Sequence, residues 1–318
     1  MNSLNISTVK STFGKYIIYF VLLFLIVALS LMSPYFLTPS NISNVLRQIS
    51  TTSIVALGMT FVIIAGGIDL SVGNVVALCG VVSASFAHPG EYPLIVSILI
   101  SMAIGLIIGL ANGFIIAKAK IVPFIVTLGT FQICRGLAMT YTGGRPVGNI
   151  SSEYKFIGQG LAWGIPVPIL IFAFLTIVSA IILHKTKIGR YIYAVGGNEL
   201  AARLSGINIF KIKLFVYSYI GLLTGISAIV LTARVSSGAP NAAQGYELDA
   251  ISACVIGGTS MSGGRGSIWG TIVGALIIGV VNNGLDLLNV SSYTQSVVKG
   301  IIIITALLLD KLGQKSKE

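Results

Sequence analysis

YIIYFVLLFLIVALSLMSPYF, residues Tyr16–Phe36, is an unbroken run without a charged side chain. A helix needs about 20 mainly apolar residues to cross the hydrocarbon core of a bilayer. The run is longer than the roughly 7–15 apolar residues of a signal peptide, and no small-residue cleavage site follows it. The stretch therefore predicts a first membrane-spanning helix rather than a cleaved leader.

The composition extends this interpretation to the whole chain. Of 318 residues, 55% are hydrophobic and 9% are charged, and the mean hydropathy is +0.95. A soluble domain carries about 25% charged residues, so most of the surface of this chain must meet lipid. The 37 glycines suit the same environment, because small residues let membrane helices approach closely.

Apolar segments of spanning length follow one another along the chain. They are 16–36, 47–67, 70–87, 93–116, 121–142, 163–184, 213–233, 248–264, 266–288 and 292–311. The third and the eighth are short and rich in glycine. No linker is long enough to hold a second domain. The sequence therefore predicts one all-α domain over 1–318, a polytopic membrane bundle of about ten transmembrane helices.

The basic residues test this count. With a cytoplasmic N-terminus, 14 Lys and Arg fall in cytoplasmic segments, 4 in external segments and 2 within spans. This excess is the positive-inside signature, so the net charge of +11 does not indicate nucleic acid. An even number of spans with both termini cytoplasmic places every basic cluster on one side. The cytoplasmic parts are then the tails 1–15 and 312–318 and the loop 185–213.

Two glycine-rich segments echo each other. Residues 66–73, GGIDLSVG, match residues 257–264, GGTSMSGG, at the glycine pair, the serine and the last glycine. Each segment lies between an incoming span and an outgoing one. The echo fits either a true internal repeat or two similar turns.

One segment of the loop 185–213 predicts a short helix. Residues 196–206 read GGNELAARLSG, in which Asn198 is a good N-cap, Glu199 complements the helix dipole and Gly206 suits the C-terminal turn. Leu200 and Leu204 lie one turn apart and would share an apolar face. The helix is either a connector lying back on its own bundle or an element presented to a cytoplasmic partner.

The loop also carries a family resemblance. The stretch 189–199, GRYIYAVGGNE, continuing through Leu204–Asn208, resembles the coupling loop of sugar permeases in ATP-binding-cassette importers. Residues 58–73 and 245–260 resemble the same family, and the similarity runs over nearly the whole chain, with ribose permeases as the nearest type. The loop departs from the Glu-Ala-Ala signature of other importers, because Leu200 separates Glu199 from the alanine pair.

The resemblance implies a function and a set of partners. It implies a homodimeric permease in the bacterial cell (inner) membrane, with a cytoplasmic ATP-binding subunit, an external soluble sugar-binding receptor and transport by alternating access. The substrate that the resemblance implies is a monosaccharide, and ribose is the first candidate. The residues expected to couple the permease to the ATPase are Gly196, Gly197, Asn198, Glu199, Leu200, Ala201, Ala202, Leu204 and Gly206.

Several polar residues are candidates for the transport path or a gate. Asp69 is either the N-cap of the third span, helped by Ser71, or a gate residue near the cytoplasmic mouth. Arg135 and Lys299 fall within spans, where a charge is costly and usually faces the bundle interior or water. Asn282 and Asn283 could bond sugar hydroxyls or hold helices together.

Three charged residues are candidates for receptor docking, although such charges are often only solvated. Arg145, Arg234 and Glu247 lie in expected outer loops. The resemblance implies that external charges help to dock the sugar-bound receptor. Arginine–carboxylate pairs would suit that contact.

No catalytic constellation is visible, so we do not expect an enzyme, and no cofactor or metal is expected. The phosphate-binding pattern Gly-x-x-x-x-Gly-Lys is absent, so ATP would be hydrolysed by another chain. The alternative function is an autonomous secondary sugar carrier or channel. Carboxylates in the middle of spans would favour a proton-coupled carrier, and a capped helix facing the cytoplasm disfavours it.

Overall fold

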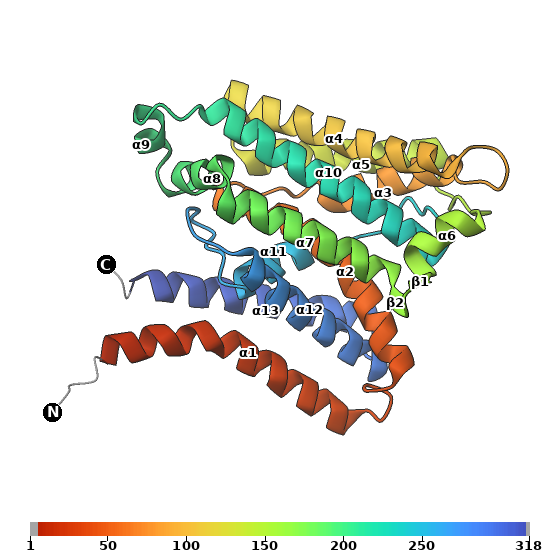
Figure 1. The fold of residues 1–318 in the computed structure, drawn as a ribbon, viewed down its shortest axis with the longest axis horizontal. Helices are drawn as coiled ribbons and strands as arrows, with labels where there is room; N and C mark the ends of the chain where they lie inside the picture. Colours follow the sequence, from red (N-terminus) through yellow and green to blue (C-terminus); the bar gives the residue numbers. More distant parts are fainter. Residues whose placement is uncertain (1–5, 316–318) are drawn as a thin grey trace.

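The computed structural model describes residues 6–315, with side chains at 18–302, 304, 305 and 308. Helices dominate this part of the chain, and one hairpin of two very short strands interrupts them (Figure 1). The helices are α1 (Ile6–Met32), α2 (Pro39–Ile64), α3 (Val72–Ser85), α4 (Leu94–Ala119), α5 (Pro123–Thr142), α6 (Ser152–Gln159), α7 (Val167–Lys185), α8 (Lys187–Gly197), α9 (Glu199–Leu204), α10 (Ile209–Val235), α11 (Tyr246–Ile256), α12 (Ile268–Leu287) and α13 (Ser292–Lys315). Strands β1 (Leu161–Ala162) and β2 (Ile165–Pro166) pair antiparallel between α6 and α7.

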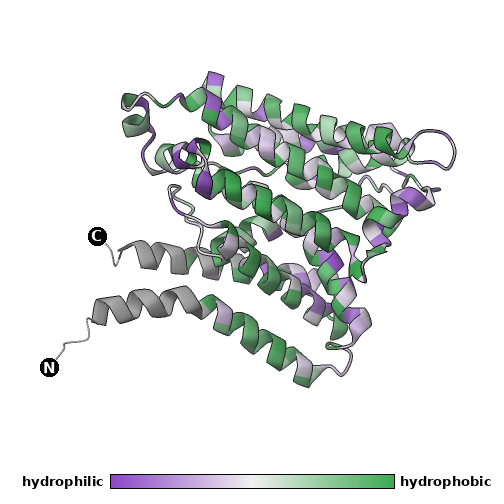
Figure 2. Ribbon diagram, viewed as in Figure 1, coloured by the Kyte–Doolittle hydropathy of each residue, from purple (hydrophilic) through white to green (hydrophobic). Residues whose placement is uncertain are grey.

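The long helices run roughly side by side, and polar segments gather at their two ends. Helices α8 and α9 lie at the same end as the start of α1 and the end of α13 (Figure 1). Helix α6 and the β-hairpin lie at the opposite end. Hydrophobic residues line most of the helix lengths between them, and hydrophilic residues gather near α8 and α6 (Figure 2).

Each of the ten expected segments contains a helix, but the helices differ in length. In the described part of the chain, five helices are long and apolar enough to cross a membrane: α2, α4, α7, α10 and α12. Helices α3 and α11 have 14 and 11 residues. At 1.5 Å per residue they extend about 21 and 16 Å, which is less than a hydrocarbon core of about 30 Å. The third and eighth segments, expected as spans over 70–87 and 248–264, are therefore short helices flanked by irregular chain.

The centre of the bundle is formed by α2 and α10. Ile54, Leu57 and Phe61 of α2 are fully buried, as is Ile220 of α10. Glycine makes the neighbouring contact between α4 and α10 possible. A Cβ at Gly105 would collide with the backbone of α10, so a larger residue there would force the two helices apart.

The two similar glycine-rich segments each connect two helices, but their backbone conformations differ. Residues 65–71 join α2 to α3, and residues 257–267 join α11 to α12. Gly66, the first glycine of its pair, has a φ of +80°. In the other pair it is the second glycine, Gly258, that has a positive φ, of +85°. The two segments therefore differ in local backbone geometry.

Candidate functional site

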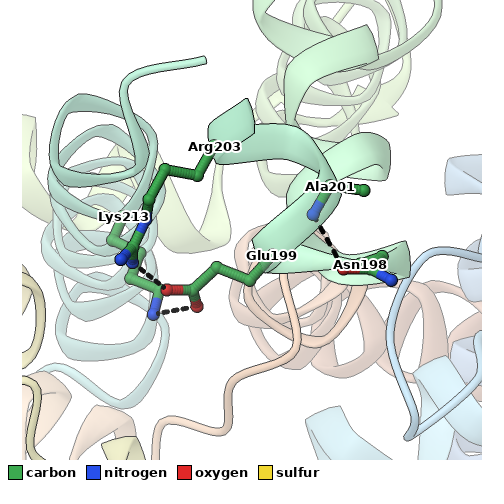
Figure 3. Close-up of polar contacts among 5 residues, drawn as sticks. All are labelled: Asn198, Glu199, Ala201, Arg203 and Lys213. Carbon is green, nitrogen blue, oxygen red and sulfur yellow. Dashed lines mark hydrogen bonds and ion pairs between the residues drawn. The ribbon is translucent and has the colours of Figure 1, made fainter. Parts of the chain in front are cut away.

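The short helix expected in the loop is α9, and it follows a second helix that the sequence did not predict. Helix α8 begins after Thr186, whose hydroxyl accepts a hydrogen bond from the N–H of Gly189 at 3.2 Å. Asn198 caps α9 by accepting a hydrogen bond from the N–H of Ala201 at 2.9 Å (Figure 3). Gly206 ends the segment with a φ of +81°, a conformation that glycine adopts without strain. The caps at both ends are those predicted.

One ion pair, between Glu199 and Lys213, holds α9 on the side of α10. Glu199 accepts a hydrogen bond from Lys213 of α10 at 2.7 Å and another from Arg203 at 3.1 Å (Figure 3). Lys213, the closer donor, lowers the pKa of Glu199 below its ordinary value, and Arg203 adds to the effect. Because α9 has only six residues, this anchoring supplies order that its own backbone hydrogen bonds cannot.

The two leucines of α9 point away from the bundle. Ala202 is 4% exposed and faces inward, while Leu200 and Leu204 are 66% and 81% exposed. Two large apolar side chains are therefore presented on an anchored, capped helix at the end of the molecule. Only the alanine face of α9 lies back on the bundle.

Three backbone segments meet where α8 ends, and we call this contact the glycine junction. It consists of Ile64 at the end of α2, Gly196 at the end of α8 and Gly264 in the turn before α12. The N–H of Gly264 donates to the carbonyl oxygen of Ile64 at 2.9 Å. A Cβ at Gly196 would collide with that carbonyl and would lie 2.8 Å from the Gly264 nitrogen. Tyr193 adds a hydrogen bond to the carbonyl of Gly266 at 2.8 Å.

A polar cavity lies between α2, α11, α12 and α13, and we call it the chamber. Its volume is about 140 Å³. Lys299 of α13 forms an ion pair with Asp249 of α11 at 3.0 Å in its wall. Asn282 of α12 also lines it. The chamber thus brings together two of the path candidates, Asn282 and Lys299, with a carboxylate that the sequence did not single out.

The neighbouring asparagine has a different place. Asn283 and Asn41 exchange two side-chain hydrogen bonds, at 2.9 and 3.0 Å, which tie α12 to the start of α2. Adjacent residues on a helix point about 100° apart. Asn283 therefore holds helices together while Asn282 faces the chamber.

Asp69 and Ser71 lie in a buried polar network away from the chamber. Asp69 is 2% exposed and accepts hydrogen bonds from the N–H of Ser71 at 2.8 Å and from its hydroxyl at 2.6 Å. Asn112 of α4 donates to the Ser71 hydroxyl at 3.2 Å and accepts from Thr130 of α5. The carboxylate thus orders the chain just before α3, and the network links α3, α4 and α5.

Arg135 is the path candidate that faces outward. It lies on α5 and is exposed in the single chain, on a helix where Gly129 and Gly136 also have open space beside them. Arg135 is thus open to its surroundings in the single chain, and its place on a path stays a prediction. Outward exposure of a residue inside an apolar helix depends on how α5 packs, which its sequence alone does not reveal.

The three docking candidates differ in how far they are exposed. Arg145 is exposed in the loop before α6, and Arg234 is half-buried at the end of α10, where its carbonyl accepts from Gln159 at 2.9 Å. Glu247 is not in an external loop. Its carboxylate packs against Gly73 at the start of α3 and its Oε2 atom is buried. Glu247 thus lies half-buried in the first turn of α11, and its part in docking stays a prediction.

Sequence reasoning missed residues whose role depends on distant partners. Asp249 carried no local signal beyond its charge, because Lys299 is 50 positions away. Arg47 donates to the carbonyl of Gln159 at 2.9 Å and so ties α2 to α6. No group of three or more His, Cys, Asp or Glu able to hold a metal ion occurs among the described residues.

Comparison with known proteins gives the class of the chain. Residues 41–307 match the family model described as branched-chain amino acid transport system / permease component. The match covers most of the chain, so the chain belongs to this family of transport permeases. With its apolar helices, it is a multi-pass protein of the bacterial inner membrane.

The most similar relatives found include sugar permeases. The chain is 47% identical to the ribose import permease protein of Haemophilus influenzae, over 95% of this chain and 96% of that one. It is 48% identical to the ribose import permease protein of Escherichia coli, over 92% of each. The chain is 38% identical to the L-arabinose transport system permease protein of Escherichia coli, over 99% of this chain and 95% of that one. No solved structure matches the chain.

Proposed function

We propose that the chain is the membrane subunit of an ATP-driven ribose importer. The similarity to ribose import permeases of two bacteria covers more than nine tenths of this chain and is higher than that to the arabinose permease. The family description names amino acids, but these relatives transport sugars by name. The chain carries no catalytic site in this proposal, and ATP is hydrolysed by a separate subunit.

The observation that carries the proposal is the exposed leucine pair on α9. Leu200 and Leu204 stand on a helix that Glu199 and Asn198 hold in place, and together they offer apolar surface to a partner. Burying two leucines stabilises a contact by roughly 3–6 kcal/mol, at about 1.5–3 kcal/mol each. That is enough to hold α9 in a groove of an ATP-binding subunit. An autonomous carrier would have no need for this surface.

Movement of α9 would reach the chamber through the glycine junction. Helix α8 precedes α9 and ends against the end of α2 and the turn that leads to α12. Both α2 and α12 line the chamber. A shift of α9 on the ATPase would therefore displace two chamber walls together, which is the mechanical requirement of alternating access.

A second copy of the chain would complete the pore. Arg135 is exposed near the middle of α5, and a charge facing lipid there is strongly unfavourable. A partner protomer packed on α5, with a water-filled path between the two, would remove that cost. The open space beside Gly129 and Gly136 would allow close helix approach. This supports a homodimer with Arg135 on the shared path.

The proposed topology has ten crossings with both termini cytoplasmic. The end with α8 and α9 carries the basic loop and would face the cytoplasm, and the end with α6, Arg145 and Arg234 would face the receptor (Figure 1). Single cysteines near Lys118 and Lys187 should be protected from an impermeant thiol reagent in intact cells, and one near Arg145 should react. The native cysteines are buried and give a low background. Labelling near Lys187 from outside would reverse the orientation.

The transport test uses the complete complex in proteoliposomes. Labelled ribose should enter only when the receptor, the ATPase and ATP are all present, and faster than arabinose or leucine. Uptake of ribose no faster than that of leucine would remove ribose as the substrate. If the permease alone moves sugar, the ATP-driven mechanism fails and the autonomous carrier replaces it.

A further inference from the structure

We propose that the chamber is a binding site for a neutral polyhydroxylated molecule, in which Asp249 accepts hydrogen bonds from sugar hydroxyls and Lys299 and Asn282 orient it. The site deepens the proposed function, on which it rests for the identity of the sugar. It gives the permease a substrate contact of its own, in addition to any binding by a receptor.

The chamber wall is unusually polar for the interior of an apolar bundle. Side chains able to form hydrogen bonds reach it from four elements and from the loop before α11. Those used in the argument are Gln48, Gln244, Asp249, Asn282, Gln295 and Lys299. Polar groups in a membrane bundle generally face a cavity or a partner because lipid cannot satisfy them. A set that converges from separate helices on one cavity indicates a ligand with several hydrogen-bonding groups.

The ion pair suits an uncharged ligand. Lys299 donates to Asp249 at 3.0 Å, and these two charges compensate each other. Asp286, the other charged residue of the lining, accepts a hydrogen bond from Gln295 at 2.8 Å. A carboxylate accepts several hydrogen bonds, so Asp249 retains capacity for hydroxyl donors. Lys299 is 28% exposed and Asp249 9% exposed at the side chain, so the lysine remains partly free to contact the guest.

One chamber residue carries an acceptor without a protein partner. The Oδ1 atom of Asn282 is buried and forms no hydrogen bond. A buried polar atom without a partner is unfavourable, and a hydroxyl donor from a ligand in the chamber would satisfy it. The amide oxygen, like the carboxylate, accepts hydrogen bonds, and the several hydroxyl groups of a sugar can donate them.

The chamber is closed toward the glycine junction. Thr60 of α2 and Thr271 of α12 bond at 2.7 Å, and Gly257 and Gly270 are so close that a Cβ on either would collide with the other segment. These contacts lie between the chamber and the turn that carries Gly264. A molecule bound in the chamber therefore cannot pass the junction toward α8 and α9 until α2 and α12 separate.

The lining distinguishes a sugar from a branched-chain amino acid. Leucine would need an apolar pocket for its side chain and separate charged partners for its two termini. Apolar side chains such as Ile49 and Ile278 also line the chamber, so the distinction rests on the charges: Asp249 and Lys299 are already paired with each other and leave no matched pair of partners for the two termini. The polyol is therefore the better match, and leucine serves as the control probe.

Binding is measured without the receptor, on the permease–ATPase complex in lipid nanodiscs. Saturation-transfer difference NMR detects weak ligands, and ribose and leucine are the probes. We expect a ribose signal, no leucine signal, and a roughly tenfold weaker ribose affinity in Asp249→Asn, because hydrogen bonds to charged groups are the strong ones. Gln48→Ala leaves the ion pair intact and should weaken the signal less, which keeps the test valid if Asp249→Asn folds poorly.

A double variant separates binding from packing. Asp249→Asn with Lys299→Gln removes both charges and leaves two neutral groups able to bond each other. If the carboxylate binds sugar, the double variant stays impaired in ribose binding and in uptake, with the ATPase still attached. If the ion pair only holds α11 against α13, the double variant recovers both, and the proposal is overturned.

The outcomes for the site and for the proposed function are distinguishable. A ribose signal that Asp249→Asn weakens supports the site even if the complete complex fails to import ribose, which would contradict only the proposed function. Normal ribose import with unchanged binding in Asp249→Asn and Gln48→Ala contradicts only the site. A leucine signal that competes with ribose overturns the ligand class.

Discussion

The backbone N–H of Gly264 donates to the carbonyl oxygen of Ile64 at 2.9 Å, and Gly196 packs against both. This bond joins the end of α2 to the turn before α12 at the point where α8 ends. Only a residue without a Cβ fits at position 196. Gly197 differs from its neighbour, because a Cβ there would have no atom within 4 Å.

The pair of glycines therefore gives a matched test of the junction. Gly196→Ala should reduce ribose uptake strongly, because overpacking of this kind costs about 1–3 kcal/mol and separates three backbone segments. Gly197→Ala should transport normally. Uptake and ATP hydrolysis are measured together in proteoliposomes, and hydrolysis that continues without uptake in Gly196→Ala would show lost coupling. Equal uptake in the two variants would contradict a role for the junction.

A second prediction concerns the leucine face of α9. Leu200→Asp with Leu204→Asp should leave the permease inserted but should detach the proposed ATPase partner and stop uptake, because charged groups replace the apolar contact. Co-purification of the ATPase and sugar uptake are the measurements. The control is Ala119→Asp with Lys120→Asn, which makes the same change of net charge at exposed positions near α9's end of the molecule.

The control substitution at position 120 is also compatible with the backbone conformation there. Lys120 has a φ of +54°, a conformation that asparagine tolerates. If the leucine variant retains the ATPase, or if the control loses it equally, the leucines do not form the contact.

A third prediction concerns the anchoring of α9 by Glu199. Glu199→Gln should accelerate hydrogen exchange of the α9 amides, because the ion pair with Lys213 is lost. Since Glu199 is 41% exposed at its side chain, the loss should be below about 1 kcal/mol. Arg203→Gln, which removes the more exposed partner, should have a smaller effect.

The same pair sets a pH dependence. Lys213 holds the pKa of Glu199 below its ordinary value of 4.5, so the folded state binds the proton less tightly than the unfolded one. The stabilisation is fully present above about pH 4.5 and is lost as the pH falls through the lowered pKa. Exchange of the α9 amides should therefore rise at acid pH in the wild type, beyond the intrinsic change, and not in Glu199→Gln.

Local signals predicted α9 well, and distant contacts explain what the sequence left out. The cap at Asn198, the turn at Gly206 and the leucine spacing are determined within a few residues. The all-helical membrane fold followed from the apolar runs. Helix α8, in contrast, contains three glycines and is stabilised by packing onto the junction, where tertiary contacts override low helix propensity.

Two other candidate residues show that the sequence does not predict which way a side chain on a helix faces. Arg135 was expected to face either the bundle interior or water, and the sequence did not decide between them; α5 packs mainly on α3 and leaves Arg135 exposed. Glu247 was expected near an external loop, and the contact between α11 and α3 buries it partly. Periodicity predicts that a helix exists, while the side it presents to its neighbours depends on residues far away in the sequence.

The fourth prediction uses the reciprocal amide pair of Asn41 and Asn283. Each single substitution by alanine leaves the other amide without its partner and should destabilise the fold by about 1 kcal/mol. The double variant should lose less stability than the sum of the two single variants. The coupling energy should be about 0.6 kcal/mol and at most about 1.7 kcal/mol, the range found for hydrogen bonds between membrane helices.

Thermal unfolding of the purified variants measures this cycle, and ribose uptake by the surviving folded protein completes it. We expect uptake per folded molecule to be normal in Asn283→Ala, because Asn283 lies outside the chamber. Asn282→Ala should behave differently, with reduced uptake per folded molecule and a small loss of stability, because its buried Oδ1 has no protein partner while the rest of its amide bonds Asp249. Additive losses in the cycle would contradict the amide pair, and normal uptake in Asn282→Ala would contradict its place on the path.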